Sequence, residues 1–201
     1  SIVMPSADPW SAARQSFLAL LPAGAHLLEA GCGEGDDLCF FRQQGLVVTA
    51  FDARLAQARV ASRRSGQPVR VCRVEQMQSV VPYDGIWASG SLPCLPEHEI
   101  APALGHLATL LKAGGPLYAS FPPGKGEPLP RSGEYPLQTR LDEAGLRQGI
   151  GRWFSEADQD EVIALFRKTS GAGTWLQGWQ SVVGGFNDGS RNMIGIGVAT
   201  A

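Results

Sequence analysis

Histidine and cysteine are scarce in this chain, and their spacing argues against whole classes of site. The 201 residues include three histidines and four cysteines. The cysteines show no C-x-x-C spacing and have no paired histidines nearby, so we expect no metal site. Disulfide bonds are not required either, because free thiols are the ordinary state in a reducing compartment. The four cysteines are Cys32, Cys39, Cys72 and Cys94.

An excess of charge and long apolar runs are also missing. The formal net charge is −2, whereas a protein that binds nucleic acid through its phosphates has a strongly basic surface. We therefore expect no nucleic-acid partner. No apolar run approaches the roughly 20 residues of a membrane-spanning helix, and the first residues lack a secretory signal pattern. We expect a cytoplasmic protein with no membrane segment.

The first 121 residues alternate between apolar runs and amphipathic stretches. This alternation predicts an α/β protein, in which a mostly parallel sheet is covered by helices on both faces in a three-layer, Rossmann-like sandwich. Strands are expected from residue 26 and at residues 46–52, 69–74, 83–89 and 116–121. Helices are expected at residues 53–64 and 97–112 and after the glycines near residue 33.

The remaining sequence changes character after residue 121. A Pro- and Gly-rich stretch follows, and the tail has two apolar runs around Asp188-Gly189, a good signal for a hairpin turn. The length suits a single domain. We therefore expect one domain over residues 1–201, with an N-terminal helix within residues 1–24. Residues 122–155 are expected to form a variable lid or substrate segment.

A glycine-rich turn is the most informative motif. The sequence Glu29-Ala30-Gly31-Cys32-Gly33-Glu34-Gly35 ends an apolar run and precedes a predicted helix, and Asp52 follows about twenty residues later. Glycines let the backbone turn tightly and approach a ligand, and the next helix directs its N–H groups toward the turn. An acid after the second strand can accept hydrogen bonds from ribose hydroxyls. The motif predicts a pocket for a nucleoside-containing cofactor.

The glycine spacing indicates which cofactor. Dinucleotide enzymes carry G-x-G-x-x-G, but here Asp36 stands where the last glycine would fall. Acidic residues suit a pyrophosphate poorly, whereas Glu29 suits the positive charge of S-adenosylmethionine. Two alternatives remain open at this point, a strand–helix turn without a ligand and a nicotinamide-dependent oxidoreductase.

With these residues, the chain resembles class I S-adenosylmethionine-dependent methyltransferases, in particular the small bacterial branch of tellurite- and thiopurine-type enzymes. The stretches at residues 28–35, 48–52, 83–92 and 110–127 carry the resemblance. It implies a seven-stranded, mostly parallel sheet with a C-terminal antiparallel hairpin, and S-adenosylmethionine as cofactor. The cofactor-binding residues that it implies are Glu29, Gly31, Cys32, Gly33, Asp52, Ala53, Glu75, Gln76, Ser89 and Gly90.

Two departures from the family pattern concern the site. Arg73 stands near the position where the family often has an acid that binds the adenine amino group, and Glu75 is the candidate substitute. The family also often has Leu-Leu-His-Val-Pro after the fourth strand, whereas residues 91–96 here contain no histidine. His26, His98 and His106 are interpreted as structural residues, so no catalytic residue is assigned.

The expected activity is therefore methyl transfer to a small-molecule acceptor by in-line displacement, which depends mainly on alignment. Arg131, Tyr135 and Trp153 are the candidate substrate residues in the variable segment. The alternative is a methyltransferase-like domain that binds S-adenosylmethionine or S-adenosylhomocysteine without catalysis. The sequence leaves the acceptor and the oligomeric state open.

Overall fold

The computed structural model describes residues 14–15, 17–121, 140–141, 176–185 and 191–199. Within the described part, no helix is long and apolar enough to cross a membrane. In chain order the elements are β1 (His26–Ala30), α2 (Asp36–Gln43), β2 (Val47–Asp52), α3 (Leu55–Ser65), β3 (Arg70–Val71), η1 (Val74–Gln76), β4 (Gly85–Ala88), η2 (Leu92–Cys94), α4 (Glu97–Thr109), β5 (Pro116–Phe121), β6 (Arg140–Leu141), β7 (Leu176–Gly185) and β8 (Arg191–Ala199).

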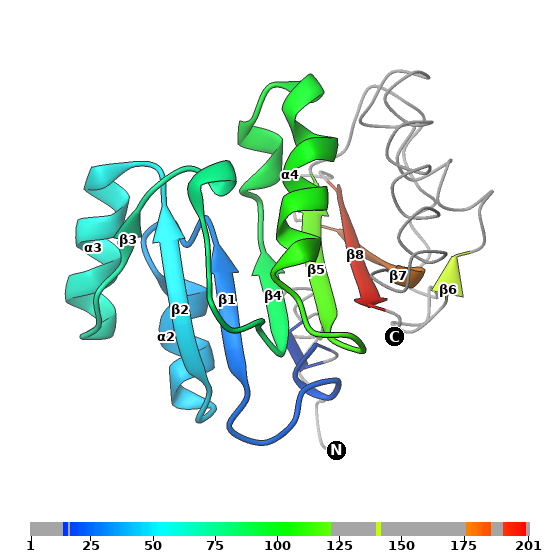
Figure 1. Cartoon of the computed structure of the whole chain (residues 1–201), viewed down its shortest axis with the longest axis horizontal. Helices are drawn as coiled ribbons and strands as arrows, with labels where there is room; N and C mark the ends of the chain where they lie inside the picture. Colours follow the sequence, from blue (N-terminus) through cyan, green and yellow to red (C-terminus); the bar gives the residue numbers. More distant parts are fainter. Residues whose placement is uncertain (1–13, 16, 122–139, 142–175, 186–190, 200–201) are drawn as a thin grey trace, which may run out of the picture.

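The strands form one sheet in the order β3-β2-β1-β4-β5-β8-β7-β6. The first five strands in this order are parallel, and β8 pairs antiparallel with β5. Strand β1 lies between β2 and β4 (Figure 1), so the chain crosses to the other side of β1 after β3. The carboxyl ends of β1 and β4 flank this switch point, where α/β sheets bind their ligands.

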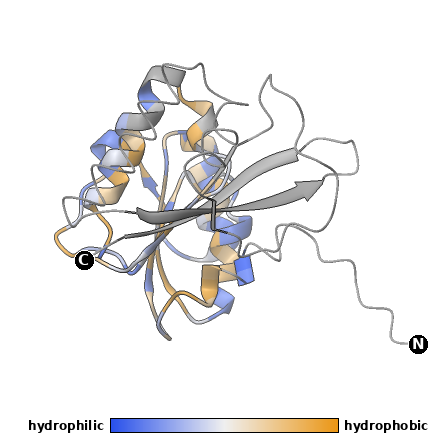
Figure 2. Ribbon diagram, turned by 90° about the vertical axis from the view of Figure 1, so that its right-hand side faces the viewer, coloured by the Kyte–Doolittle hydropathy of each residue, from blue (hydrophilic) through white to orange (hydrophobic). Residues whose placement is uncertain are grey.

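Side chains alternate between the two faces of each parallel strand. Leu28 and Ile86 belong to the buried core on the α4 face. Their neighbours Leu27 and Trp87 belong to a second core, which includes Phe41 of α2. Helices therefore cover both faces, as the three-layer prediction requires (Figure 2).

The strand count differs from the seven expected, because the described part contains eight. Strand β6 has only two residues and pairs antiparallel with β7. Two residues cannot carry an apolar period, so sequence patterning does not reveal such a strand. Strands β7 and β8 pair antiparallel, but residues 186–190 between them lie outside the described residues. The predicted turn at Asp188-Gly189 therefore stays a prediction.

Two predicted elements end three residues earlier in the structure than expected. The strand expected at 69–74 is only β3, because the chain turns into η1, where Gln76 accepts a hydrogen bond from the Arg73 N–H at 2.9 Å. The helix expected at 97–112 ends at Thr109. Its last predicted residues instead pair with Tyr83, whose N–H donates to the Leu110 carbonyl at 2.8 Å. A local hydrogen bond therefore ends the first element, and a tertiary hydrogen bond ends the second.

The N-terminal segment packs against α2. Residues 14–15 and 17–18 are helical, and the rest of the predicted first helix before Phe17 lies outside the described residues. Phe17 is fully buried, with its ring 5.1 Å from Trp87. Arg14 donates to Asp37 at 2.8 Å. The segment thereby covers one face of the sheet beside the glycine turn.

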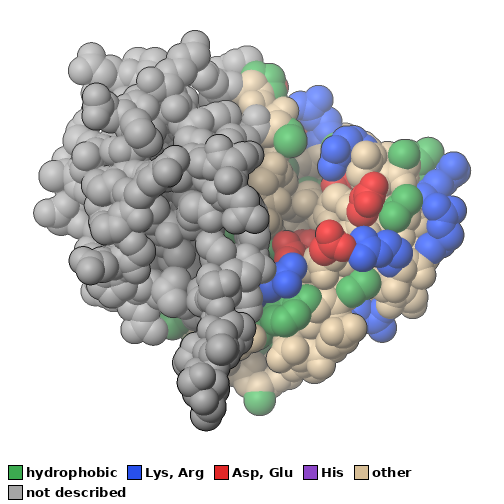
Figure 3. Space-filling view, turned by 180° about the vertical axis from the view of Figure 1, so that it is seen from behind, with side chains coloured by type: hydrophobic (Ala, Val, Ile, Leu, Met, Phe, Trp, Pro, Cys, Tyr) green, Lys and Arg blue, Asp and Glu red, His purple; other side chains and the backbone are tan. Residues whose placement is uncertain are grey.

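Acidic side chains lie among more numerous basic ones on the back of the described part. Figure 3 shows them next to one another rather than in separate patches. One exposed pair in the described part is Arg64 with Asp36, at 2.6 Å. Such exposed pairs are each worth about 0–1 kcal/mol, so the core and not this surface charge holds the fold together.

Candidate functional site

The glycine turn joins β1 to α2. Gly31, Gly33 and Gly35 have φ of +74°, +56° and +94°, conformations that residues with a side chain rarely adopt. The Gly31 N–H donates to the Phe51 carbonyl at 2.9 Å. A Cβ on Gly31 would lie 2.3 Å from the Ser91 Cβ. The turn is therefore fixed between the ends of β2 and β4 and has no room for a side chain at Gly31.

Asp52 ends β2 and holds this turn in place. The Gly33 N–H donates to its Oδ2 at 2.9 Å, and the Arg54 N–H donates to its Oδ1 at 2.8 Å. The Arg54 Nε also lies 3.1 Å from Oδ1, and this hydrogen bond raises the pKa of the guanidinium. Asp52 is only 3% exposed. The carboxylate is thus fixed in orientation at the edge of the sheet.

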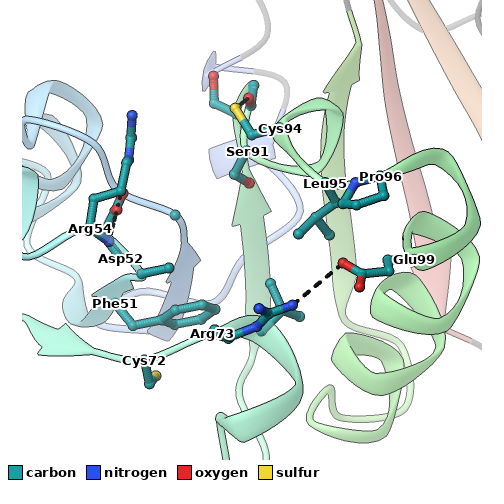
Figure 4. Close-up of a pocket in the computed structure, with 15 residues that line it drawn as sticks. Phe51, Asp52, Arg54, Cys72, Arg73, Ser91, Cys94, Leu95, Pro96 and Glu99 are labelled. Carbon is teal, nitrogen blue, oxygen red and sulfur yellow. Dashed lines mark hydrogen bonds and ion pairs between the residues drawn. The ribbon is translucent and has the colours of Figure 1, made fainter.

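A cavity of about 440 Å³ opens beside these groups, at the carboxyl ends of the parallel strands (Figure 4). Its walls combine apolar and charged side chains, and they include residues of β2, η1, η2 and α4. The lining residues are Gly31, Phe51, Asp52, Ala53, Arg54, Cys72, Arg73, Val74, Ser89, Gly90, Ser91, Cys94, Leu95, Pro96 and Glu99. An apolar pocket with a few converging polar groups is typical of a small-molecule site.

Arg73 bridges two carboxylates at the end of the cavity near α4. Its Nε lies 2.5 Å from Glu75 Oε1, and its Nη2 lies 3.5 Å from Glu99 Oε2. Backbone hydrogen bonding, followed by the bond from Arg73, lowers the pKa of Glu75. Arg73 and Glu99 line the cavity, whereas Glu75 does not. Figure 4 shows Glu99 on α4 facing Arg73.

Glu29 lies buried behind the turn, on the other face of the sheet from α4. It is 2% exposed, and its Oε2 has no hydrogen-bond partner among the described residues. Burial raises its pKa well above the usual value, and the neighbouring Asp37 carboxylate adds to this effect. Burial also raises the pKa of the Cys32 thiol to about 12. Cys32 is therefore a neutral packing residue rather than a nucleophile.

The structure brings together five residues of the predicted cofactor set in the cavity wall, namely Gly31, Asp52, Ala53, Ser89 and Gly90. Five others do not line it, namely Glu29, Cys32, Gly33, Glu75 and Gln76. Gly33 contributes through its bond to Asp52. The candidate substrate residues Arg131, Tyr135 and Trp153 lie outside the described residues. No group of three potential ligands for a metal occurs in the described part of the chain.

Several lining residues are absent from the predicted set. Phe51 and Arg54 flank Asp52, and Ser91 follows Gly90, so a wider window around each strand end would have included them. Glu99 is not close in sequence to a strand end, because it lies on a helix. Only the packing of α4 brings its first turn to the cavity.

The strand order, the glycine turn after β1 and the acid after β2 define a Rossmann-like α/β protein with a nucleoside-type pocket. The sequence model of the methyltransferase domain family matches residues 7–172. The chain therefore belongs to the methyltransferase domain family. A comparison with curated proteins finds no significant match.

Solved methyltransferases share this fold at low sequence identity. The N-methyltransferase NodS from Bradyrhizobium japonicum is 15% identical with a TM-score of 0.64, over 98% of this chain and 100% of that one. A 1,6-didemethyltoxoflavin-N1-methyltransferase from Burkholderia thailandensis is 21% identical with a TM-score of 0.63, over 98% and 80%. Magnesium protoporphyrin IX methyltransferase from Synechocystis is 16% identical with a TM-score of 0.62, over 94% and 78%.

Proposed function

We propose that this chain is an S-adenosylmethionine-dependent methyltransferase that acts on a small molecule. The observation that carries the proposal is the cavity of about 440 Å³ in which the glycine turn and the buried Asp52 meet. Its apolar walls suit a purine, and its carboxylate suits ribose hydroxyls. The similar Synechocystis enzyme was crystallised with S-adenosylmethionine, and the Burkholderia enzyme with S-adenosylhomocysteine. Both ligands carry the nucleoside that this pocket fits.

The residues present fit this cofactor. Each oxygen of the Asp52 carboxylate accepts one backbone N–H and one N–H of the Arg54 guanidinium. The Arg54 side chain is largely exposed, so a ribose hydroxyl would take the place of the guanidinium as a donor to the carboxylate. Gly31 lets the backbone approach the ligand, and Ser89 and Gly90 line the same cavity. Glu29, buried behind the turn, adds acceptor capacity on the side expected for the cationic methionine part. These roles are proposed for the five lining residues of the predicted set and for Glu29.

The cofactor supplies a methyl group on a sulfonium, which leaves as a neutral thioether. The protein aligns this donor with the acceptor and excludes water. Among the described lining residues, the two carboxylates are each paired with an arginine, Asp52 with Arg54 and Glu99 with Arg73. A carboxylate held in this way is a poor base, whereas a thiolate or reduced chalcogen needs none. We therefore propose a soft anionic acceptor, as in the tellurite- and thiopurine-type branch.

The acceptor is proposed to bind under residues 122–155 of the single domain. This segment follows β5, whose carboxyl end lies at the same edge of the sheet as those of the other parallel strands. Arg131, Tyr135 and Trp153 remain the candidate contacts. Turnover of thiols rather than alcohols or amines, with reduced turnover for Tyr135→Ala and Trp153→Ala, is the expected result of an acceptor panel.

Calorimetric titration with S-adenosylmethionine, S-adenosylhomocysteine and NADH tests the cofactor. Micromolar binding of the two adenosyl ligands and no binding of NADH is expected. If neither adenosyl ligand binds, the proposal is wrong. Binding without turnover across the acceptor panel would instead indicate the non-catalytic domain.

Asp52→Ala should weaken binding of S-adenosylhomocysteine by about 1–3 kcal/mol, because the ribose loses its charged acceptor. Asp84→Ala is the matched control. Asp84 also accepts a backbone N–H, from His26 at 2.8 Å, but at the start of β1 and outside the cavity. Its removal should leave the affinity unchanged. Equal affinity in both variants would remove Asp52 from the site.

A further inference from the structure

Glu99 and Arg73 form a charged pair that the proposed methyl-transfer chemistry does not use. They come from different elements, because Arg73 immediately precedes η1 and Glu99 lies in the first turn of α4. Both line the cavity that contains Asp52. In Figure 4 the Phe51 and Arg73 side chains lie between Asp52 and Glu99, so the two carboxylates occupy opposite ends. A nucleoside that binds Asp52 with its sugar and spans the cavity would place its base near Glu99.

The surroundings of the pair suit the edge and faces of a purine. Leu95 and Pro96 adjoin Glu99 from the η2 side, and Val74 follows Arg73. These apolar groups can cover the faces of a ring. The pair itself offers an acceptor beside a donor, since a carboxylate only accepts hydrogen bonds and a guanidinium only donates them. The amidine edge of adenine, an amino donor beside a ring-nitrogen acceptor, is complementary to this arrangement.

We propose that Glu99 is the residue that selects adenine, by accepting a hydrogen bond from its 6-amino group, and that Arg73 positions the carboxylate. This inference rests on the proposed cofactor. It assigns the hydrogen bond from the adenine amino group to a residue on α4 rather than to Glu75, which the sequence suggests. Glu75 pairs with the same arginine at 2.5 Å but does not line the cavity. Glu99 is 36% exposed by side chain and reaches it.

The test compares S-adenosylhomocysteine with its 6-oxo analogue, S-inosylhomocysteine, by calorimetry. The unmodified protein should prefer the amino ligand about tenfold to a hundredfold, because the analogue places a carbonyl oxygen against a carboxylate. Glu99→Gln should abolish or reverse this preference, since a carboxamide can donate to the 6-oxo group. Glu75→Gln is the matched control, which breaks the other ion pair of Arg73 and should leave the preference unchanged.

Two further variants separate positioning from folding. If the cation holds Glu99 in place, Arg73→Met should reduce the preference for S-adenosylhomocysteine over S-inosylhomocysteine. Arg73→Lys should then retain that preference. The Glu99→Ala variant should bind the two ligands equally, without a reversed preference. It provides a second test if Glu99→Gln does not fold. Thermal unfolding of each variant identifies any loss of the native state.

The outcomes distinguish this inference from the proposed function. If the unmodified protein binds neither ligand, the proposed function fails. If it prefers the amino ligand and Glu99→Gln keeps that preference, the inference is overturned and the proposed function stands. Loss of the preference in Glu75→Gln alone would assign adenine recognition to Glu75.

Discussion

At the scale of single residues, Gly31 has two independent reasons to be glycine. Its φ is +74°, and a Cβ there would lie 2.3 Å from that of Ser91. Gly33 shares only the first reason, since its φ is +56° but nothing lies within 4 Å of an added Cβ. The pair therefore separates backbone strain from steric overlap.

Gly31→Ala should lower the free energy of unfolding more than Gly33→Ala. Both variants incur the left-handed conformation, at about 1–2 kcal/mol, and Gly31→Ala adds about 1–3 kcal/mol of overpacking. Chemical denaturation without ligand measures both. Adding Ser91→Gly to Gly31→Ala should recover the second contribution. Equal losses of unfolding free energy in the two single variants would show that Ser91 moves aside without an energetic cost.

Glu29 is a buried acid whose pKa is raised in the folded protein. An unfolded glutamate ionises near its usual value of 4.5, so above that pH the folded state binds more protons than the unfolded state. The contribution of Glu29 to stability is thus complete below pH 4.5 and is lost as pH rises through the folded pKa.

Glu29→Gln keeps the side-chain volume and removes this titration. The variant should gain stability over the unmodified protein as pH rises from 4.5, by about 1.4 kcal/mol per pH unit until the folded pKa is reached. Urea denaturation of both proteins over this pH range gives the difference between their free energies of unfolding. The contributions of the other carboxylates cancel in this difference. A constant difference would mean that folding does not raise the pKa of Glu29.

At the scale of elements, the start of α2 is held by a polar cluster beneath the N-terminal segment. Asp37 accepts hydrogen bonds from Arg14 at 2.8 Å and from the Trp87 indole at 2.9 Å. Trp87 in turn stacks on Tyr118, with ring centroids 3.6 Å apart. One carboxylate therefore connects α2, β4 and the segment that contains Arg14.

Asp37→Ala should reduce the free energy of unfolding by about 1–3 kcal/mol, because the indole N–H loses its partner in the core. Asp36→Ala is the control. Asp36 lies in the same first turn of α2, so the helix-dipole effect is shared. However, its partner in the described part is Arg64 at the surface, so its loss should cost less than about 1 kcal/mol. Equal effects would indicate that charge, not the buried bonds, matters.

At the scale of the whole molecule, the cavity joins elements that are far apart in the sequence. Gly31, Asp52, Arg73, Ser89 and Glu99 meet there from five separate segments. A ligand that contacts all of them binds the folded chain and not the unfolded one. Binding must then raise the stability of the entire domain.

S-adenosylhomocysteine at about 100 times its dissociation constant should stabilise the fold by about 2.7 kcal/mol. For a domain of this size, that corresponds to an increase in Tm of roughly 5–10 °C. Differential scanning calorimetry measures it, and NADH at the same concentration should leave Tm unchanged. An equal shift with NADH would point to a less selective nucleotide pocket.

Much of the fold and part of the site were predictable because their causes are local. Apolar runs and glycine spacing predicted the parallel strands through β5, and Gly31 and Asp52 follow directly from strand ends. The end of the helix at Thr109 was not predictable, because hydrogen bonds with Tyr83, which is distant in sequence, determine it. The short β3 ends in a local turn at η1, which the apolar pattern does not reveal.

The sequence by itself determined the alternation of strands and helices, the glycine turn and the acid after β2. Parallel strands place their carboxyl ends at one edge of a sheet, so these groups must converge once the sheet forms. Only the tertiary structure decided that Glu99, and not Glu75, lines the cavity. Which side of a helix meets a pocket depends on how that helix packs on the sheet, and no local pattern around Glu99 contains this information.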